Sequence, residues 1–192
     1  MNRDQIENLL RQENTAYKER NFDLALELAE KLAGENVPSS FFTCGLILEK
    51  GWSSFGIDLN RALEFYKKLA IQWNDAEGYL GCVRIILARK EFDKRDKAIQ
   101  YCLTETKGRL SYLAYLLLAR IYEEMYSPPD YRLAKKCCIK SIFLGSAWAL
   151  RNYALILGRS GNIAGAFSMH IVATVCSPLI VVFGGFKKVR KG

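Results

Sequence analysis

Apolar positions along this chain recur at the spacing of amphipathic helices, and the helices come in pairs. In one stretch Leu24, Leu28 and Leu32 fall on one face, with Ala25 and Ala29 beside them, which is the pattern of a helix that buries one side. Comparable stretches are separated by short breaks rich in Asn, Asp, Gly, Ser and Pro. The sequence therefore predicts five helical hairpins. The first, third and fourth span residues 4–35, 75–107 and 110–144. The second begins at residue 39 and has its loop at 51–56, and the fifth begins at residue 146 and has its turn at 158–162.

Small residues mark the same point of each hairpin. In the second helices the alanines recur at intervals of 37, 36, 36 and 32 residues, at Ala25, Ala62, Ala98, Ala134 and Ala166. In the first helices the intervals are 36, 38 and 35 residues, at Gly45, Gly81, Ala119 and Ala154. Periods of this length are typical of stacked helical repeats. We expect these positions to be buried where helix backbones approach closely.

Three segments resemble Sel-one-like repeats, a class of the tetratricopeptide superfamily. They are RALEFYKKLA (61–70), KAIQYCLTETKG (97–108) and LAKKCCIKSIFLGSAWAL (133–150). The match lies in a Lys/Arg-Ala start, an aromatic pair and a Gly before the next hairpin, and it departs at Cys137-Cys138, which replace the aromatic pair. The resemblance covers residues 4–170. It implies an all-α, right-handed alpha-alpha solenoid of about five hairpins with an adaptor or scaffold role, and it carries no catalytic residue.

The C-terminal stretch differs from the rest of the chain. No charged residue occurs between residues 161 and 186, and a basic cluster follows. We therefore divide the chain into a solenoid over residues 1–170 and an apolar tail over 171–192. Two alternatives stand for the tail: insertion into one leaflet of a membrane, or burial against the array or a partner. The expected contact residues are Ile171, Leu179, Ile180, Val181, Val182, Phe183, Phe186, Lys187, Lys188 and Arg190.

Charge and cysteine content narrow the class of protein. The net charge of +8 is uneven, with −3 over residues 1–50 and +6 over residues 151–192. Because no nucleic-acid-binding motif accompanies it, we expect a solvated basic face and no nucleic-acid partner. Six cysteines lie within apolar helical stretches, and the N-terminus has no apolar signal region. We expect buried free thiols in a cytoplasmic protein. The compactness of the chain and its repeat type favour a bacterial protein.

The residues that could carry chemistry do not cluster. His170 is the one histidine and lies in an apolar stretch, so we expect it to be packed. Cys137 and Cys138 are adjacent, and adjacent side chains on a helix point about 100° apart, which does not make a chelating pair. No Cys-x-x-Cys, phosphate-binding loop or Gly-x-Ser-x-Gly elbow occurs. We expect no catalytic residue, no cofactor, no metal and no enzymatic activity.

The sequence thus favours a non-catalytic scaffold or adaptor on the cytoplasmic side that binds another protein, and it leaves both alternatives for the tail open, including attachment to the cytoplasmic face of a membrane. The alternative is a soluble inhibitor or immunity-type protein with one cognate partner. In related arrays the first helices of the hairpins line the binding face, and long polar and aromatic side chains there suit an interface. The residues expected to bind the partner are Tyr79, Arg84, Tyr115, Arg120, Asn152 and Tyr153.

Overall fold

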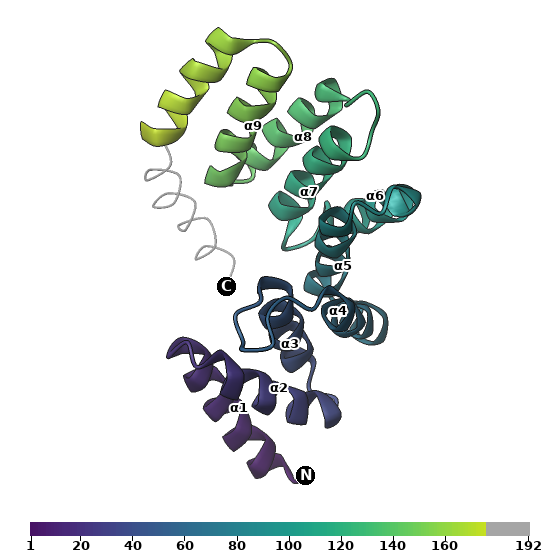
Figure 1. Cartoon of the computed structure of the whole chain (residues 1–192), viewed down its shortest axis with the longest axis vertical. Helices are drawn as coiled ribbons and strands as arrows, with labels where there is room; N and C mark the ends of the chain where they lie inside the picture. The colour runs from purple at the N-terminus through teal and green to yellow at the C-terminus, as the bar shows by residue number, and fades with distance from the viewer. Residues whose placement is uncertain (176–192) are drawn as a thin grey trace. The chain divides into compact units, whose positions relative to one another are not determined.

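A computed structural model describes residues 1–175, and within this range the chain is helical without a strand (Figure 1). The predicted contact residues from Leu179 to Arg190 lie outside the described residues. A further helix, which has no label in Figure 1, covers residues 163–175. The labelled helices are α1 (Arg3–Lys18), α2 (Phe22–Gly34), α3 (Pro38–Lys50), α4 (Leu59–Trp73), α5 (Ala76–Arg89), α6 (Arg95–Glu105), α7 (Ser111–Glu124), α8 (Tyr131–Phe143) and α9 (Ala147–Arg159), with a short 3-10 turn at Phe92–Lys94.

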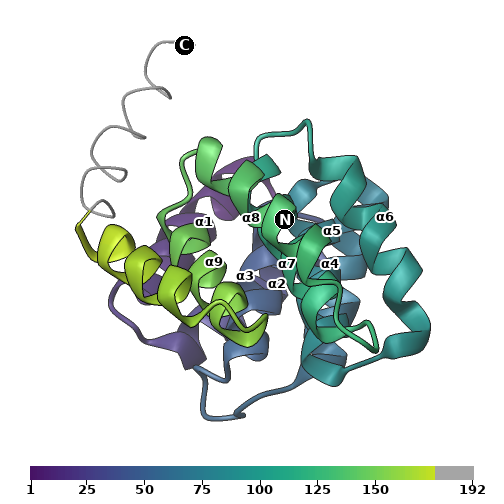
Figure 2. The same cartoon turned by 90° about the horizontal axis from the view of Figure 1, so that it is seen from above.

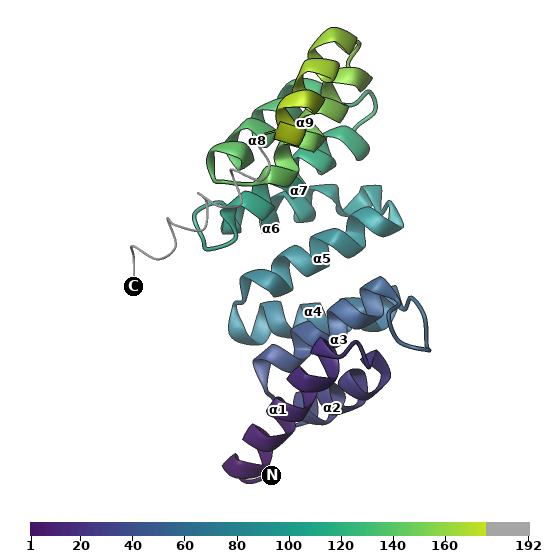
Figure 3. The same cartoon turned by 90° about the vertical axis from the view of Figure 1, so that its left-hand side faces the viewer.

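The helices pack in successive pairs, which confirms the predicted all-α repeat architecture. The described chain forms two compact units, Met1–Ala88 and a second that begins at Arg89. In the first unit α1 packs on α2, α2 on α3, and α3 on α4. In the second unit α6, α7, α8 and α9 pack in chain order, as the turned views of Figures 2 and 3 also show. The third predicted hairpin has α5 in the first unit and α6 in the second.

Short polar side chains begin many of these helices where the sequence places its breaks. Asn21 caps α2 by accepting a hydrogen bond from the Leu24 amide, and Asp130 caps α8 in the same way. Asp58 caps α4 by accepting hydrogen bonds from the backbone amides of Asn60 and Arg61. Pro38 is the first residue of α3. A proline fits the first turn of a helix because its missing N–H has no partner there anyway.

The repeated alanines are buried as predicted. Ala25, Ala62, Ala98 and Ala134 have no exposed surface, and Ala166 is nearly buried. The small residues of the first helices were expected to lie where two helix backbones approach each other. At Gly45 and Gly81 this is wrong, because a Cβ there would meet the ring of Tyr66 rather than a helix backbone. The close approach of two backbones lies elsewhere. At Gly78 a Cβ would come within 2.4 Å of the backbone nitrogen of Ala70, so α4 and α5 touch at that point.

The last described helix runs across the proposed boundary between residues 170 and 171. Its buried side carries Ala166 and Ala173, and Gly158 of α9 faces Ala166. Ile171 is exposed, as are Ile163 and Phe167. Among the described residues, none of the helices combines the length and apolarity needed to span a bilayer.

Candidate functional site

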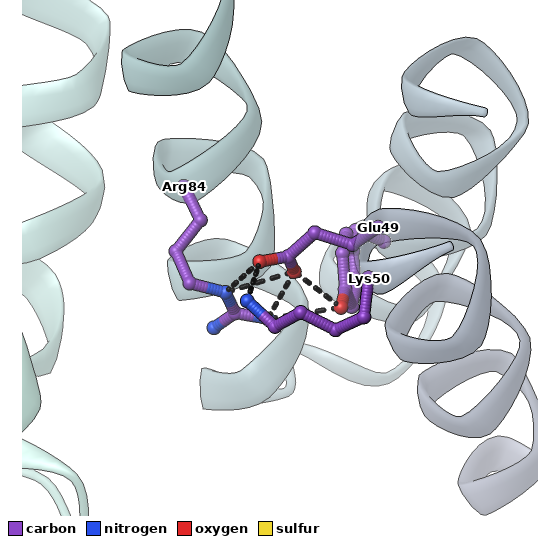
Figure 4. A network of polar contacts seen from close by, with 4 residues as sticks. Glu49, Lys50 and Arg84 are labelled. Carbon is purple, nitrogen blue, oxygen red and sulfur yellow. Dashed lines mark hydrogen bonds and ion pairs between the residues drawn. The ribbon is translucent and has the colours of Figure 1, made fainter. Parts of the chain in front are cut away.

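A polar network joins three helices of the first unit (Figure 4). The Arg84 Nε atom on α5 lies 3.1 Å and 2.9 Å from the two carboxylate oxygens of Glu49 on α3. The Tyr66 hydroxyl on α4 donates to Glu49 Oε2 over 2.9 Å, and Arg84 Nη2 donates to the Tyr66 hydroxyl oxygen over 2.9 Å. The Lys50 ammonium lies 2.8 Å from Glu49 Oε1. Every charge in the network thus has a partner of opposite sign.

The electrostatics of the network keep Glu49 ionised. Burial alone would raise the pKa of Glu49, but Arg84 and the hydrogen bonds from Lys50 and Tyr66 outweigh it and lower that pKa. Burial raises the pKa of Tyr66, and the neighbouring Glu49 carboxylate adds to this rise, although Arg84 opposes it. The Tyr66 phenol therefore stays protonated. A protonated phenol beside a paired carboxylate is a structural contact between helices rather than an acid–base pair.

The Tyr66 ring fits between two glycines of neighbouring helices. A Cβ at Gly45 on α3 would lie 2.7 Å from a ring carbon, and a Cβ at Gly81 on α5 would lie 2.5 Å from one. Real Cβ atoms essentially never come this close to another heavy atom. The Arg84 guanidinium carbon lies 5.2 Å from the centroid of the same ring. The ring and the network above it therefore fix α3, α4 and α5 together.

The cysteines of residues 1–175 are free thiols, and all five are buried: Cys44, Cys82, Cys102, Cys137 and Cys138. Burial raises the pKa of Cys102 and Cys138 to about 12 and that of Cys137 to about 11. Because the thiolate is the reactive form, these side chains are poor nucleophiles at neutral pH. The predicted buried free thiols are confirmed for these five, and Cys176 lies outside the described residues.

His170 is exposed, so its predicted packing is wrong. The prediction assumed that an apolar helix packs against other elements on every face. Among the described residues, no element packs on the side of the last helix that carries His170. Within the same range, no group of three or more His, Cys, Asp or Glu side chains lies close enough to hold a metal ion.

The six predicted binding residues lie on the first helices of hairpins, but several of them have local partners. Arg84 is largely buried in the network with Glu49. The Tyr79 hydroxyl donates to Asn74 Oδ1. Arg120 donates twice to Glu124, one turn further along α7. The amide of Asn152 donates to the Trp148 carbonyl, and Tyr115 and Tyr153 are half-buried.

A surface on α8 was not predicted. Arg132, Lys136 and Lys140 recur every four residues, and Ile139 and Phe143 lie between and beyond them. At 100° per residue these five side chains fall within an arc of about 100°, and we call this surface the α8 face. All five are exposed, Phe143 by 82%. The helix contains no acidic residue. The spacing and the missing acidic residues are visible in the sequence and could have pointed to this face.

Comparisons with known proteins identify the fold and nothing finer. No protein-family model matches the chain, and no curated protein matches it. Two solved structures of MamA have a similar fold. One is 18% identical with a TM-score of 0.61, covering 97% of this chain and 94% of that chain. The other is 19% identical with a TM-score of 0.59, covering 93% of this chain and 96% of that chain. With the successive helical pairs, this likeness shows a tetratricopeptide-like fold.

Proposed function

We propose that this protein is a non-catalytic interaction scaffold that binds an acidic, partly apolar segment of another protein through its α8 face. The observation that carries the proposal is the arrangement of Arg132, Lys136 and Lys140 around the exposed side chains of Ile139 and Phe143. Apolar side chains give an interface its contact area, and surrounding cations select a partner of opposite charge. A tetratricopeptide-like fold supports this role, because repeat arrays present extended surfaces to other molecules.

The α8 face has no acidic residue on its own helix, a property that α8 shares with α9. Arg120 is paired with Glu124, and Arg159 with Glu123. The Lys140 ammonium lies 4.9 Å from the centroid of the Tyr115 ring. This contact is weak at an exposed site, so Lys140 can turn to a carboxylate at little cost. The face thus offers three cations to a partner.

A random peptide library displayed on phage tests the proposal, with the full chain as bait. We expect the selected peptides to be rich in Asp and Glu with interspersed aromatic or aliphatic residues. The variant Arg132→Glu/Lys136→Glu/Lys140→Glu should lose them by at least about tenfold, because like charges repel at an interface. Lys67→Glu/Lys68→Glu is the matched control, since both lysines are exposed on another second helix, α4. Peptides that bind the triple variant normally would overturn the proposal.

The six residues predicted from the sequence form a second proposed contact surface on the first helices. We would test it with Tyr115, Arg120, Asn152 and Tyr153 changed to alanine. Arg84 is left out because its removal would leave the buried Glu49 carboxylate without this cationic partner and would destabilise the fold. The same selection separates a general scaffold from an inhibitor with one cognate partner, since a single strict consensus favours the inhibitor. The Sel-one-like class, the cytoplasmic location and the bacterial origin remain predictions that rest on the sequence.

A further inference from the structure

The helices of the second unit run back and forth between two ends of the unit. At one end α6 and α8 finish and α7 and α9 begin, and there the helix of residues 163–175 reaches its last described turn (Figure 1). At the other end α7 and α9 finish, and α6 and α8 begin. The helices α8 and α9 and the described part of the last helix have 13 residues each, so the α8–α9 turn and Val175 lie at the same end.

Exposed apolar side chains gather at this end. Phe143 and Leu144 follow each other into the α8–α9 turn and are 82% and 48% exposed. Trp148, in the first turn of α9, is 69% exposed. Val172 and Val175, in the last described turn, are also exposed. We call these five residues the apolar end, and an exposed apolar patch of this kind marks a contact with a partner or a membrane.

The charges around the apolar end are of one sign. Three segments form this end of the unit, residues 104–112, 140–151 and 170–175, and every exposed charged side chain in them is basic. The acidic residue among them, Glu105, is buried. The exposed cations are Lys107, Arg109, Lys140 and Arg151. The apolar end is therefore surrounded by cations without exposed carboxylates.

The acidic residues of the second unit lie towards its opposite end. Residues 89–175 contain seven of them, and six lie around the start of α6, at the end of α7 or directly before α8. These six are Glu91, Asp93, Asp96, Glu123, Glu124 and Asp130. After Asp130 the sequence has ten basic residues and no acidic one. The unit thus has one apolar, basic end and one end where its carboxylates gather.

We propose that the apolar end binds an anionic lipid surface, with Leu144 and Trp148 reaching past the headgroups. The indole of Trp148 suits the boundary between headgroups and acyl chains, because it is apolar apart from one N–H. The guanidinium carbon of Arg151 lies 5.9 Å from the centroid of that ring, so a cation accompanies the indole to the negatively charged headgroups. The proposal goes beyond the α8 face, although Phe143 and Lys140 border both surfaces.

A lipid surface fits this arrangement better than a protein segment does. The apolar side chains come from the ends of three helices, and a bilayer contacts several projecting ends at once without a matching shape. The cations stand on two separate turns, where each can meet a different headgroup. Because the carboxylates gather at the opposite end, none of the exposed ones described in the second unit would face the negative leaflet.

Co-sedimentation with vesicles tests the contact. Full-length protein is mixed with vesicles of equal parts phosphatidylserine and phosphatidylcholine, and with vesicles of phosphatidylcholine alone. The variant Leu144→Glu/Trp148→Glu places two carboxylates in the contact. Its matched control is Leu155→Glu/Ile163→Glu, which changes two apolar side chains of similar exposure, 45% and 76%, away from the apolar end. Both variants leave the α8 face unchanged, so failure here does not affect the peptide test of that face.

We expect the unchanged protein to sediment with the anionic vesicles. Leu144→Glu/Trp148→Glu should weaken this binding by about tenfold or more, because apolar burial and attraction to the headgroups are both lost, and the control pair should weaken it much less. Absence of binding, equal binding to phosphatidylcholine alone, or an equal loss in the control pair overturns the proposal. Capture of an acidic peptide that depends on Leu144 and Trp148, without vesicle binding, overturns it in favour of a protein partner.

The fluorescence of Trp148 gives a second readout, which does not depend on those variants. With Trp52→Phe and Trp73→Phe, Trp148 is the one tryptophan of the chain, and circular dichroism checks that helicity is kept. Its emission should shift to shorter wavelength with the anionic vesicles, and lipids brominated on their acyl chains should quench it. Sedimentation with the vesicles without either change would show that another part of the chain binds the lipid, which overturns the proposal.

Discussion

Arg84 contacts Glu49 on α3 and Tyr66 on α4 and so links both helices to α5. The sequence suggested a partner-binding role for this residue because a long cation on a first helix suits an interface. Its pairing depends on Glu49, which lies 35 residues earlier, and no local pattern shows that distance. At residue scale the repeated small positions were predictable, but the side chain that fills the space beside Gly45 and Gly81 was not.

We predict that Gly81→Ala destabilises the protein. The added Cβ would lie 2.5 Å from the Tyr66 ring, so the cost should be about 1–3 kcal/mol from overpacking. Gly34→Ala is the control, because a Cβ there meets nothing within 4 Å. Urea denaturation measures both. Changing Tyr66→Leu as well should reduce the cost of Gly81→Ala, and an equal cost in that background would show that the ring is not the obstacle.

We predict that Glu49 makes stability depend on acid pH. Its pKa is lowered in the folded state, so the unfolded chain binds more protons as the pH falls. The stabilisation is present above the ordinary carboxyl pKa of about 4.3 and is lost as the pH falls below it. Glu49→Gln should be less stable at pH 7 and should lose less stability on acidification. Parallel acid profiles of the two proteins would contradict this assignment.

At the scale of elements, the period of the apolar and small residues predicts the helices and their pairing. Asn21 and Asp130 lie in these breaks, and in the structure each caps the helix that follows by accepting a backbone hydrogen bond. Pro38 is the first residue of α3, and the sequence alone does not fix this position because proline both ends helices and begins them. The exposure of His170 could not be read from its apolar neighbours, because burial depends on whether another element follows.

We predict that Ala98→Leu destabilises the second unit. Ala98 on α6 has no exposed surface, so a larger side chain there should cost about 1–3 kcal/mol. Gln100 is exposed on the same helix, which makes Gln100→Leu the matched control. Thermal unfolding followed by circular dichroism compares the two. An unchanged melting temperature for Ala98→Leu would mean that α6 moves aside to accept the larger side chain.

At the scale of the whole molecule, the two compact units differ in charge. Residues 1–88 carry 10 basic and 13 acidic side chains, whereas residues 89–175 carry 14 basic and 7 acidic ones. The overall charge of +8 therefore belongs to the second unit and to the residues after 175. An acidic partner should meet the second unit first, and its association should weaken as salt screens the attraction.

We predict that the buried thiols report unfolding of both units. Cys44 and Cys82 lie in the first unit, and Cys102, Cys137 and Cys138 lie in the second. In a Cys176→Ser variant none of these five should react with a thiol reagent in native buffer, because all five are buried. All five should react once denaturant removes the helical signal. Fast labelling of any of them in native buffer would show that its helix pair opens under native conditions.

The glycines on either side of Tyr66 limit how this array can be rebuilt. Inserting a second copy of residues 38–73 would place another Gly45 against the first Tyr66 and another Tyr66 against Gly81, so every ring would still have glycine on both sides. Deleting α5 and α6 would bring Ala119 of α7 to the place of Gly81, with a methyl group where the ring now lies. An engineer can lengthen the chain at this joint but cannot shorten it without also changing Tyr66.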